Sequence, residues 1–195
     1  MVIDGHISAS VADVPSGTNP ELRIVMLGEA GVGKTALITR FVTGTFDGQY
    51  RQSMGTTVTE KRISIRDSRG TQREVTVRLM DMGGRGTYRE LRRQFMKGAH
   101  GAVLVYDVTR PETFMAMNNW YETFRDSCPD ACLVICANKV DLKDKRMVPF
   151  ETGVMLQKWL QADYFETSAE NGQNVSEAFL MLVKLTHDRY FSTSD

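Results

Sequence analysis

The chain of 195 residues is poor in cysteine and proline, carries no net charge and has no long apolar segment. Three cysteines are too few for the dense disulfide framework of a small secreted domain, and low cysteine use fits a reducing compartment. The 24 basic and 24 acidic side chains balance, which removes the usual reason to expect nucleic-acid binding. No apolar run approaches the roughly 18 residues that span a bilayer. We therefore expect a soluble globular protein.

The common membrane-targeting signals are also missing from this sequence. Residues 1–20 contain no apolar core of the kind that a signal peptide needs. Val2 excludes N-myristoylation, and the final residues, FSTSD, include no cysteine for prenylation. We therefore expect a cytoplasmic protein without an intrinsic membrane anchor, which associates with membranes only through partners.

Apolar runs of strand length alternate with helical patterns beyond residue 20. The runs 22–27, 102–106 and 132–136 are continuous, as in strands that are covered on both faces. The alternating pattern of 63–79, interrupted by the turn signal DSRG, predicts a β-hairpin. Strands alternating with helices predict an α/β fold with a mostly parallel sheet.

The sequence pattern also predicts a flexible N-terminal arm at 1–20, one domain at 21–191 and a short C-terminal end at 192–195. Thr109 is placed to cap a helix whose first turn contains Pro111. The cysteines at 128, 132 and 136 lack the paired spacing of a zinc site, so we interpret them as apolar fillers in and before a buried strand.

A glycine-rich motif follows the first apolar run and opens a helical segment. Residues 28–35 read GEAGVGKT, a complete G-x4-G-K-T pattern that we call the P-loop. Its glycines let backbone N–H groups surround an anion at the N-terminus of a helix. This chemistry predicts a nucleotide phosphate site, with Lys34 on the β- and γ-phosphates and the Thr35 hydroxyl on Mg²⁺.

A second motif selects the base. Residues 138–141 read NKVD and directly follow the apolar run at 132–136. The carboxylate of Asp141 can accept hydrogen bonds from N1–H and the exocyclic amine of guanine, a pair of donors that adenine lacks. The Asn138 amide can meet another edge of the purine, and the Lys139 stem can cover its plane. The motif therefore favours GTP over ATP and argues against an ATP-dependent kinase or motor.

Together these residues resemble the small GTPases of the Ras superfamily. The segment DMGG at 81–84 resembles their switch II motif, ETSA at 166–169 resembles their last guanine-contact loop, and 97–109 is similar to the Rab branch. The resemblance implies a three-layer P-loop NTPase fold, the G domain, with a six-stranded mostly parallel sheet and helices on both faces. It also implies GTP, GDP and Mg²⁺ as ligands.

The resemblance assigns roles to single positions. Mg²⁺ would be held by Thr35, Ser53 and, through a water, Asp81. The nucleotide would be bound by Ala30, Gly31, Val32, Gly33, Lys34, Thr35, Ala36, Phe46, Ser53, Gly84, Asn138, Lys139, Asp141, Ser168, Ala169 and Glu170. Lys34 and Gly84 would also serve catalysis at the γ-phosphate.

Two switch positions depart from the family pattern. Ser53 stands where the family has threonine; its hydroxyl can still bind Mg²⁺. Arg85 stands where the family has the glutamine that orients the attacking water. Because arginine has no hydrogen-bond acceptor, we predict slow GTP hydrolysis.

The predicted function is a guanine-nucleotide-dependent switch with a Rab-like role in vesicle trafficking or signalling. Effectors would contact a surface of Val58, Met80 and Phe95, where Rab proteins carry an aromatic triad, and an exchange factor and a GTPase-activating protein are expected. The alternative is a constitutively GTP-loaded binding module with negligible hydrolysis, for which ciliary transport is one setting.

Overall fold

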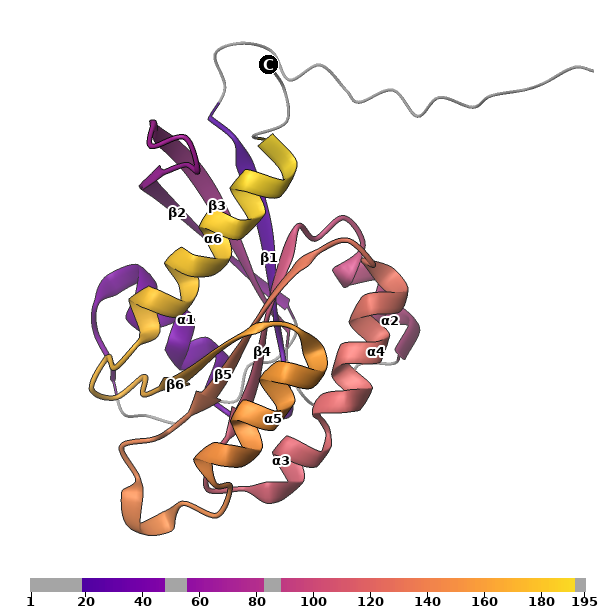
Figure 1. The fold of residues 1–195 in the computed structure, drawn as a ribbon, viewed down its shortest axis with the longest axis vertical. Helices are drawn as coiled ribbons and strands as arrows, with labels where there is room; N and C mark the ends of the chain where they lie inside the picture. The colour runs from indigo at the N-terminus through magenta and orange to yellow at the C-terminus, as the bar shows by residue number, and fades with distance from the viewer. Residues whose placement is uncertain (1–18, 48–55, 83–88, 192–195) are drawn as a thin grey trace, which may run out of the picture.

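Six strands form a single sheet in a computed structural model that describes residues 19–47, 56–82 and 89–191. Their order across the sheet is β2-β3-β1-β4-β5-β6 (Figure 1). The strands are β1 Glu21–Leu27, β2 Thr56–Arg66, β3 Gln72–Met82, β4 Gly101–Asp107, β5 Cys132–Asn138 and β6 Asp163–Thr167. Only β2, at one edge, runs antiparallel to its neighbour within the described sheet. The predicted α/β fold is confirmed.

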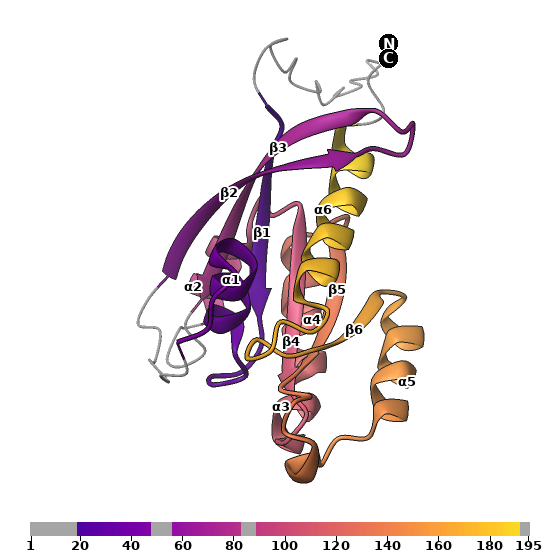
Figure 2. The same cartoon turned by 90° about the vertical axis from the view of Figure 1, so that its left-hand side faces the viewer.

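Helices cover both faces of this sheet and make a three-layer structure (Figures 1 and 2). They are α1 Lys34–Thr43, α2 Arg89–Met96, α3 Pro111–Met115, α4 Met117–Ser127, α5 Phe150–Leu160 and α6 Val175–Phe191, with a 3₁₀ turn at Lys143–Lys145. The helices α1 and α6 lie on one face, where the rings of Phe41 and Phe179 stack at 4.5 Å. The helices α2, α4 and α5 lie on the other, around Trp120 and Phe124. The sheet is thus buried on both sides, as the continuous apolar runs predicted.

The strand pair β2 and β3 forms the expected hairpin, with Thr56 opposite Met82 and Arg66 opposite Gln72. Its turn is held by the carboxylate of Asp67, which accepts backbone hydrogen bonds from Arg69 at 3.0 Å and Thr71 at 2.8 Å. This is the local bonding that favours aspartate at the start of turns.

The cysteine interpretation is consistent with the structure. Cys132 and Cys136 lie in β5, Cys128 is buried before it, and all three are free thiols. Burial raises the pKa of the Cys136 thiol to about 12, so that cysteine stays protonated and acts as a small apolar side chain. Within the described residues, no helix is long and apolar enough to cross a membrane.

The predicted cap at Thr109 is wrong. Helix α3 is preceded instead by Arg110, without a side-chain cap, and the Thr109 hydroxyl donates to the carboxylate of Asp107 at 2.7 Å. The Thr109 N–H donates to the same oxygen at 2.9 Å. Asp107, at the end of β4, therefore accepts hydrogen bonds from both polar groups of Thr109, and α3 begins one residue later than a Thr109 cap would place it.

Candidate nucleotide site

The P-loop connects β1 to α1 and depends on glycine at two positions. Gly28 has a φ of +133° and Gly33 a φ of +103°, backbone conformations that disfavour other residues. A Cβ at position 28 would lie 2.1 Å from the carbonyl oxygen of Val105, and one at position 33 would lie 2.2 Å from Asn138 Nδ2. Gly33 stands at the N-cap of α1, where a glycine leaves the first-turn N–H groups open to an anion.

Lys34 begins α1 and turns back across this loop. Its Nζ donates to the carbonyl oxygen of Gly28 at 2.7 Å and to that of Glu29 at 2.9 Å, and the residue is 6 % exposed. The P-loop therefore holds a buried ammonium group against its own backbone, at the position where the sequence predicts phosphate.

Thr35 and Asp81 meet beside the P-loop although they come from different elements. The Thr35 hydroxyl on α1 donates to the carboxylate of Asp81 on β3, and Asp81 is buried. A hydroxyl and a carboxylate are ligands that Mg²⁺ favours, and Mg²⁺ commonly takes one or two protein ligands together with substrate phosphates. Among the described residues, no group of three or more His, Cys, Asp or Glu side chains could hold a metal ion. The Thr35 hydroxyl and the Asp81 carboxylate fit such a Mg²⁺ ion.

A pocket of about 90 Å³ adjoins the P-loop on the side of β5 and β6. Phe46 forms part of its wall and is 38 % exposed. The residues that line the pocket are Gly33, Ala36, Phe46, Asn138, Lys139, Asp141, Leu142, Ala169 and Glu170. The structure therefore gathers the NKVD motif, the ETSA loop and Phe46 around one hollow. Leu142 is a lining residue that the motifs did not indicate.

Hydrogen bonds fix the polar groups of this pocket. Asn138 Nδ2 donates to the carbonyl oxygen of Val32 at 2.8 Å, and Asn138 Oδ1 accepts from the Thr167 hydroxyl at 3.3 Å. Asn138 thus braces the P-loop against β6 while it lines the pocket. The Ser168 hydroxyl donates to Asp141 Oδ1 at 2.5 Å and sets the orientation of that carboxylate.

Two further residues hold the pocket in shape, and sequence reasoning missed both. The side chain of Asp107 is fully buried, and its carboxylate forms an ion pair with the Lys139 ammonium group at 2.6 Å. This ion pair holds the lysine stem along the pocket. Arg40 on α1 donates to the carbonyl oxygen of Ala169 at 2.7 Å and also to that of Glu170. The position of Asp107 at the end of an apolar run could have indicated it as a site residue, whereas nothing in the sequence around Arg40 indicates its role.

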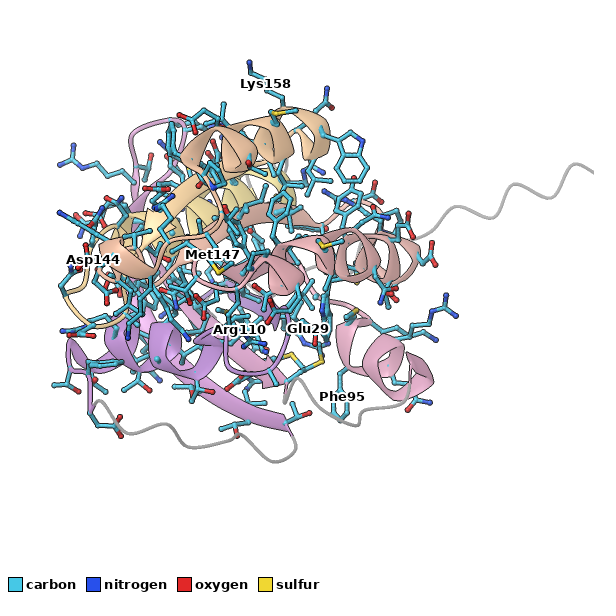
Figure 3. All side chains as sticks on the ribbon, turned by 90° about the horizontal axis from the view of Figure 1, so that it is seen from below. Glu29, Phe95, Arg110, Asp144, Met147 and Lys158 are labelled. Atoms are coloured by element: carbon cyan, nitrogen blue, oxygen red, sulfur yellow. The ribbon has the colours of Figure 1, made fainter. Side chains whose placement is uncertain are left out.

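The segment around α3 and α4 contacts two of the four variable residues of the P-loop, Glu29 and Ala30. Trp120 Nε1 donates to Glu29 Oε1 at 3.0 Å, and the Arg110 guanidinium donates to the carbonyl oxygen of Ala30 at 3.0 Å. Figure 3 shows Glu29 and Arg110 where the P-loop faces these helices. Because Trp120 is only 2 % exposed, its indole is a rigid support for the loop.

We expect Trp120→Phe to accelerate GDP release about tenfold, since the smaller phenyl ring lacks the N–H that donates to the Glu29 carboxylate. Release of a fluorescent GDP analogue measures the rate. Trp159→Phe is the matched control, because Trp159 is exposed on α5. Equal release rates in the two variants would contradict a role for the Trp120 contact.

The switch predictions fall largely outside the described residues. Ser53, Gly84 and Arg85 belong to the ranges 48–55 and 83–88, and their placement is not described.

The predicted effector surface needs a correction at Met80. Val58 is 52 % exposed and Phe95 is partly buried, but Met80 is only 7 % exposed. Met80 lies opposite Val58 on β3, an interior strand between β2 and β1, and belongs to the core beneath α2 and α4. Arg23 Nη2 lies 3.9 Å from its sulfur. Of the three positions, Val58 and Phe95 remain candidates for partner contact.

The fold and the site define this protein as a small GTPase of the P-loop class. Residues 23–188 match the Ras family. Ras-related protein Rab-27A from Homo sapiens is 33% identical over 175 residues, which cover 86% of this chain and 79% of the relative. Ras-related protein RabC from Dictyostelium discoideum is 31% identical over 163 residues, which cover 83% and 82%. The chain belongs to the Ras family and is Rab-like.

Proposed function

We propose that this chain is a guanine-nucleotide-dependent switch that binds GTP and GDP with Mg²⁺. The observation that carries the proposal is the pocket beside the P-loop, in which Ser168 orients the Asp141 carboxylate. An ionised carboxylate there accepts two hydrogen bonds from guanine and none of equal geometry from adenine. Phe46 and the stem of Lys139 enclose the base, and Asn138, Ala169 and Glu170 complete its surroundings.

The phosphates occupy the P-loop in this proposal. Backbone N–H groups of Gly31, Val32 and Gly33 surround them, and Ala30, Thr35 and Ala36 flank the same turn. Lys34 exchanges its two carbonyl partners for the β- and γ-phosphates. Thr35, Ser53 and, through a water, Asp81 would hold Mg²⁺, which would supply charge neutralisation, and Gly84 would contact the γ-phosphate.

The nucleotide that the purified protein retains tests this proposal. We expect GDP or GTP after denaturation and chromatography, and loss of that nucleotide after treatment with a chelator. In a competition assay, unlabelled GDP and GTP should displace a fluorescent GDP analogue, whereas ATP should not. Equal displacement by ATP would refute guanine selection by Asp141.

A switch acts through partners whose affinity depends on the bound nucleotide. We propose that effectors contact the face that carries Val58, an exposed residue of the edge strand β2, and Phe95, a partly buried residue of α2, since exposed apolar side chains mark contact surfaces. Membership of the Ras family and the Rab-like relatives support a setting in membrane trafficking or signalling, with an exchange factor and a GTPase-activating protein as regulators.

Slow hydrolysis follows from Arg85 in this proposal. Hydrolysis requires a water to attack the γ-phosphorus while the bond to the bridging oxygen breaks, and arginine offers no acceptor to orient that water. We expect Arg85→Gln to raise the single-turnover rate of GTP hydrolysis at least about tenfold. Arg85→Lys, which also lacks an acceptor, serves as the control and should not accelerate the reaction. No acceleration by glutamine would show that Arg85 is not the cause of slow turnover.

Arg85 also supports the alternative, a binding module that remains loaded with GTP. Exchange and hydrolysis measured on the same preparation separate the two functions. A protein that keeps intact GTP for hours, with exchange slower still, is the binding module.

A further inference from the structure

An apolar stripe lies on the outward side of α5, away from the nucleotide pocket. Met155 is 71 % exposed and Trp159 is 62 % exposed, whereas Leu156 and Leu160 of the same helix are buried in the core. Met155 and Trp159 are neighbours on one helix face, because residues four apart lie one above the other. A single exposed apolar side chain is ordinary, but an exposed tryptophan beside an exposed methionine is typical of a surface that contacts a partner.

The stripe continues onto α4. The rings of Tyr121 and Trp159 lie 6.3 Å apart between centroids, and the Arg125 guanidinium lies 5.4 Å above the Tyr121 ring. The aromatic surface therefore bridges two helices and is held by contacts within the chain. Residues of this kind lose little conformational freedom when they are covered by a partner.

The charges around Met155 indicate which kind of partner the stripe suits. Glu151 and Lys158 are both exposed on α5, two helical turns apart and on the same side as Met155. Figure 3 shows Lys158 pointing away from the body of the molecule. Glu151 and Lys158 balance each other, and Arg125 leaves the stripe a single positive charge. This is not the cluster of basic side chains that binds an anionic membrane or a nucleic acid.

The same charge pattern is complementary to itself. If two copies of α5 pack antiparallel about a twofold axis near Met155, Glu151 of each copy faces Lys158 of the other. Such an isologous contact uses the same residues on both sides and closes after two subunits.

We propose that the α5 face of Glu151, Met155, Lys158 and Trp159, with Tyr121 of α4, is the docking surface for a second copy of this chain. Met155 lies at the axis, Trp159 supplies the buried anchor, and the two charge pairs fix the antiparallel orientation. None of these five residues lines the nucleotide pocket, so the proposed docking face is separate from that pocket.

Sedimentation equilibrium of the full chain over a concentration series tests the dimer. We expect a monomer–dimer equilibrium that Trp159→Ala weakens about a hundredfold and Met155→Ala weakens about tenfold. Met147→Ala is the control, because Met147 is 64 % exposed but precedes α5. The emission of Trp159 should shift to shorter wavelength as dimer forms, since Trp120 is already buried. A monomer throughout the series would overturn the proposal.

Charge reversal tests the antiparallel register. Glu151→Lys and Lys158→Glu should each weaken the dimer about tenfold, because each places like charges opposite one another. The double variant should regain wild-type association, since it restores both pairs with their signs exchanged. A double variant that retains its nucleotide but dimerises no better than the single variants would refute this register. Binding of neutral phosphatidylcholine vesicles by a chain that stays monomeric would assign the face to a lipid surface and overturn the proposal.

Discussion

Replacing Gly33 by alanine is expected to lower the affinity for GDP about a thousandfold. The new Cβ would lie 2.2 Å from Asn138 Nδ2, a contact that real structures do not tolerate, and the backbone φ of +103° is strained for alanine. Strain and overpacking of this kind each cost about 1–3 kcal/mol. The Asn138 side chain cannot move away without breaking its hydrogen bond to the carbonyl oxygen of Val32, so the clash must displace the P-loop backbone.

Isothermal titration with GDP measures this effect, and Gly70→Ala is the matched control. Gly70 also has a positive φ, +80°, but a Cβ there meets nothing within 4 Å in the turn between β2 and β3. The control therefore carries the backbone strain without the clash and should bind GDP like the wild type. If the two variants bind GDP equally well, the close approach of Gly33 to Asn138 is not what makes glycine necessary.

Asp141→Asn is expected to lower the affinity for GDP about a thousandfold and to invert the preference between GDP and xanthosine diphosphate. In the proposed pocket the carboxylate would accept two hydrogen bonds from guanine, and bonds to a charged group contribute about 1.5–3 kcal/mol each. An asparagine amide can instead donate to the oxygen that xanthine carries at position 2. The Ser168 hydroxyl can still donate to the amide oxygen, which keeps the side chain in place.

Competition between the two diphosphates for a fluorescent GDP analogue measures this inversion. Asp144→Asn is the control, because Asp144 is an exposed aspartate in the 3₁₀ turn that follows the pocket. Unchanged selectivity in Asp141→Asn would mean that another group reads the base, and the assignment of the pocket to guanine would fail.

The fold was predictable because its signals are local. A few consecutive residues are enough to recognise the continuous apolar runs of β4 and β5. The same is true of the alternating pattern on either side of the Asp67 turn. The burial of Met80 was not predictable in this way. Whether β3 lies at an edge or inside the sheet is decided by pairing with β1, and a local pattern does not contain that information.

The site residues also divide into those that local patterns indicate and those that depend on long-range packing. Asn138, Asp141 and the P-loop were found because each motif is contiguous, and the structure places them around one pocket. Trp120 was missed because its contact to Glu29 spans 91 positions in the chain. Such supporting contacts depend on how helices pack over the sheet. The roles assigned to Ser53, Gly84 and Arg85 remain predictions that the proposed kinetics test.

The contacts of Arg40 have a consequence for how the protein is made. This arginine reaches across 129 positions to the carbonyl oxygen of Ala169, so the pocket wall is complete only when β6 and the loop after it are in place. A ribosome has therefore synthesised most of the chain before the site can close. With the proposed function, nucleotide binding is then a late event of folding, and guanine nucleotide stabilises the finished chain rather than its folding intermediates.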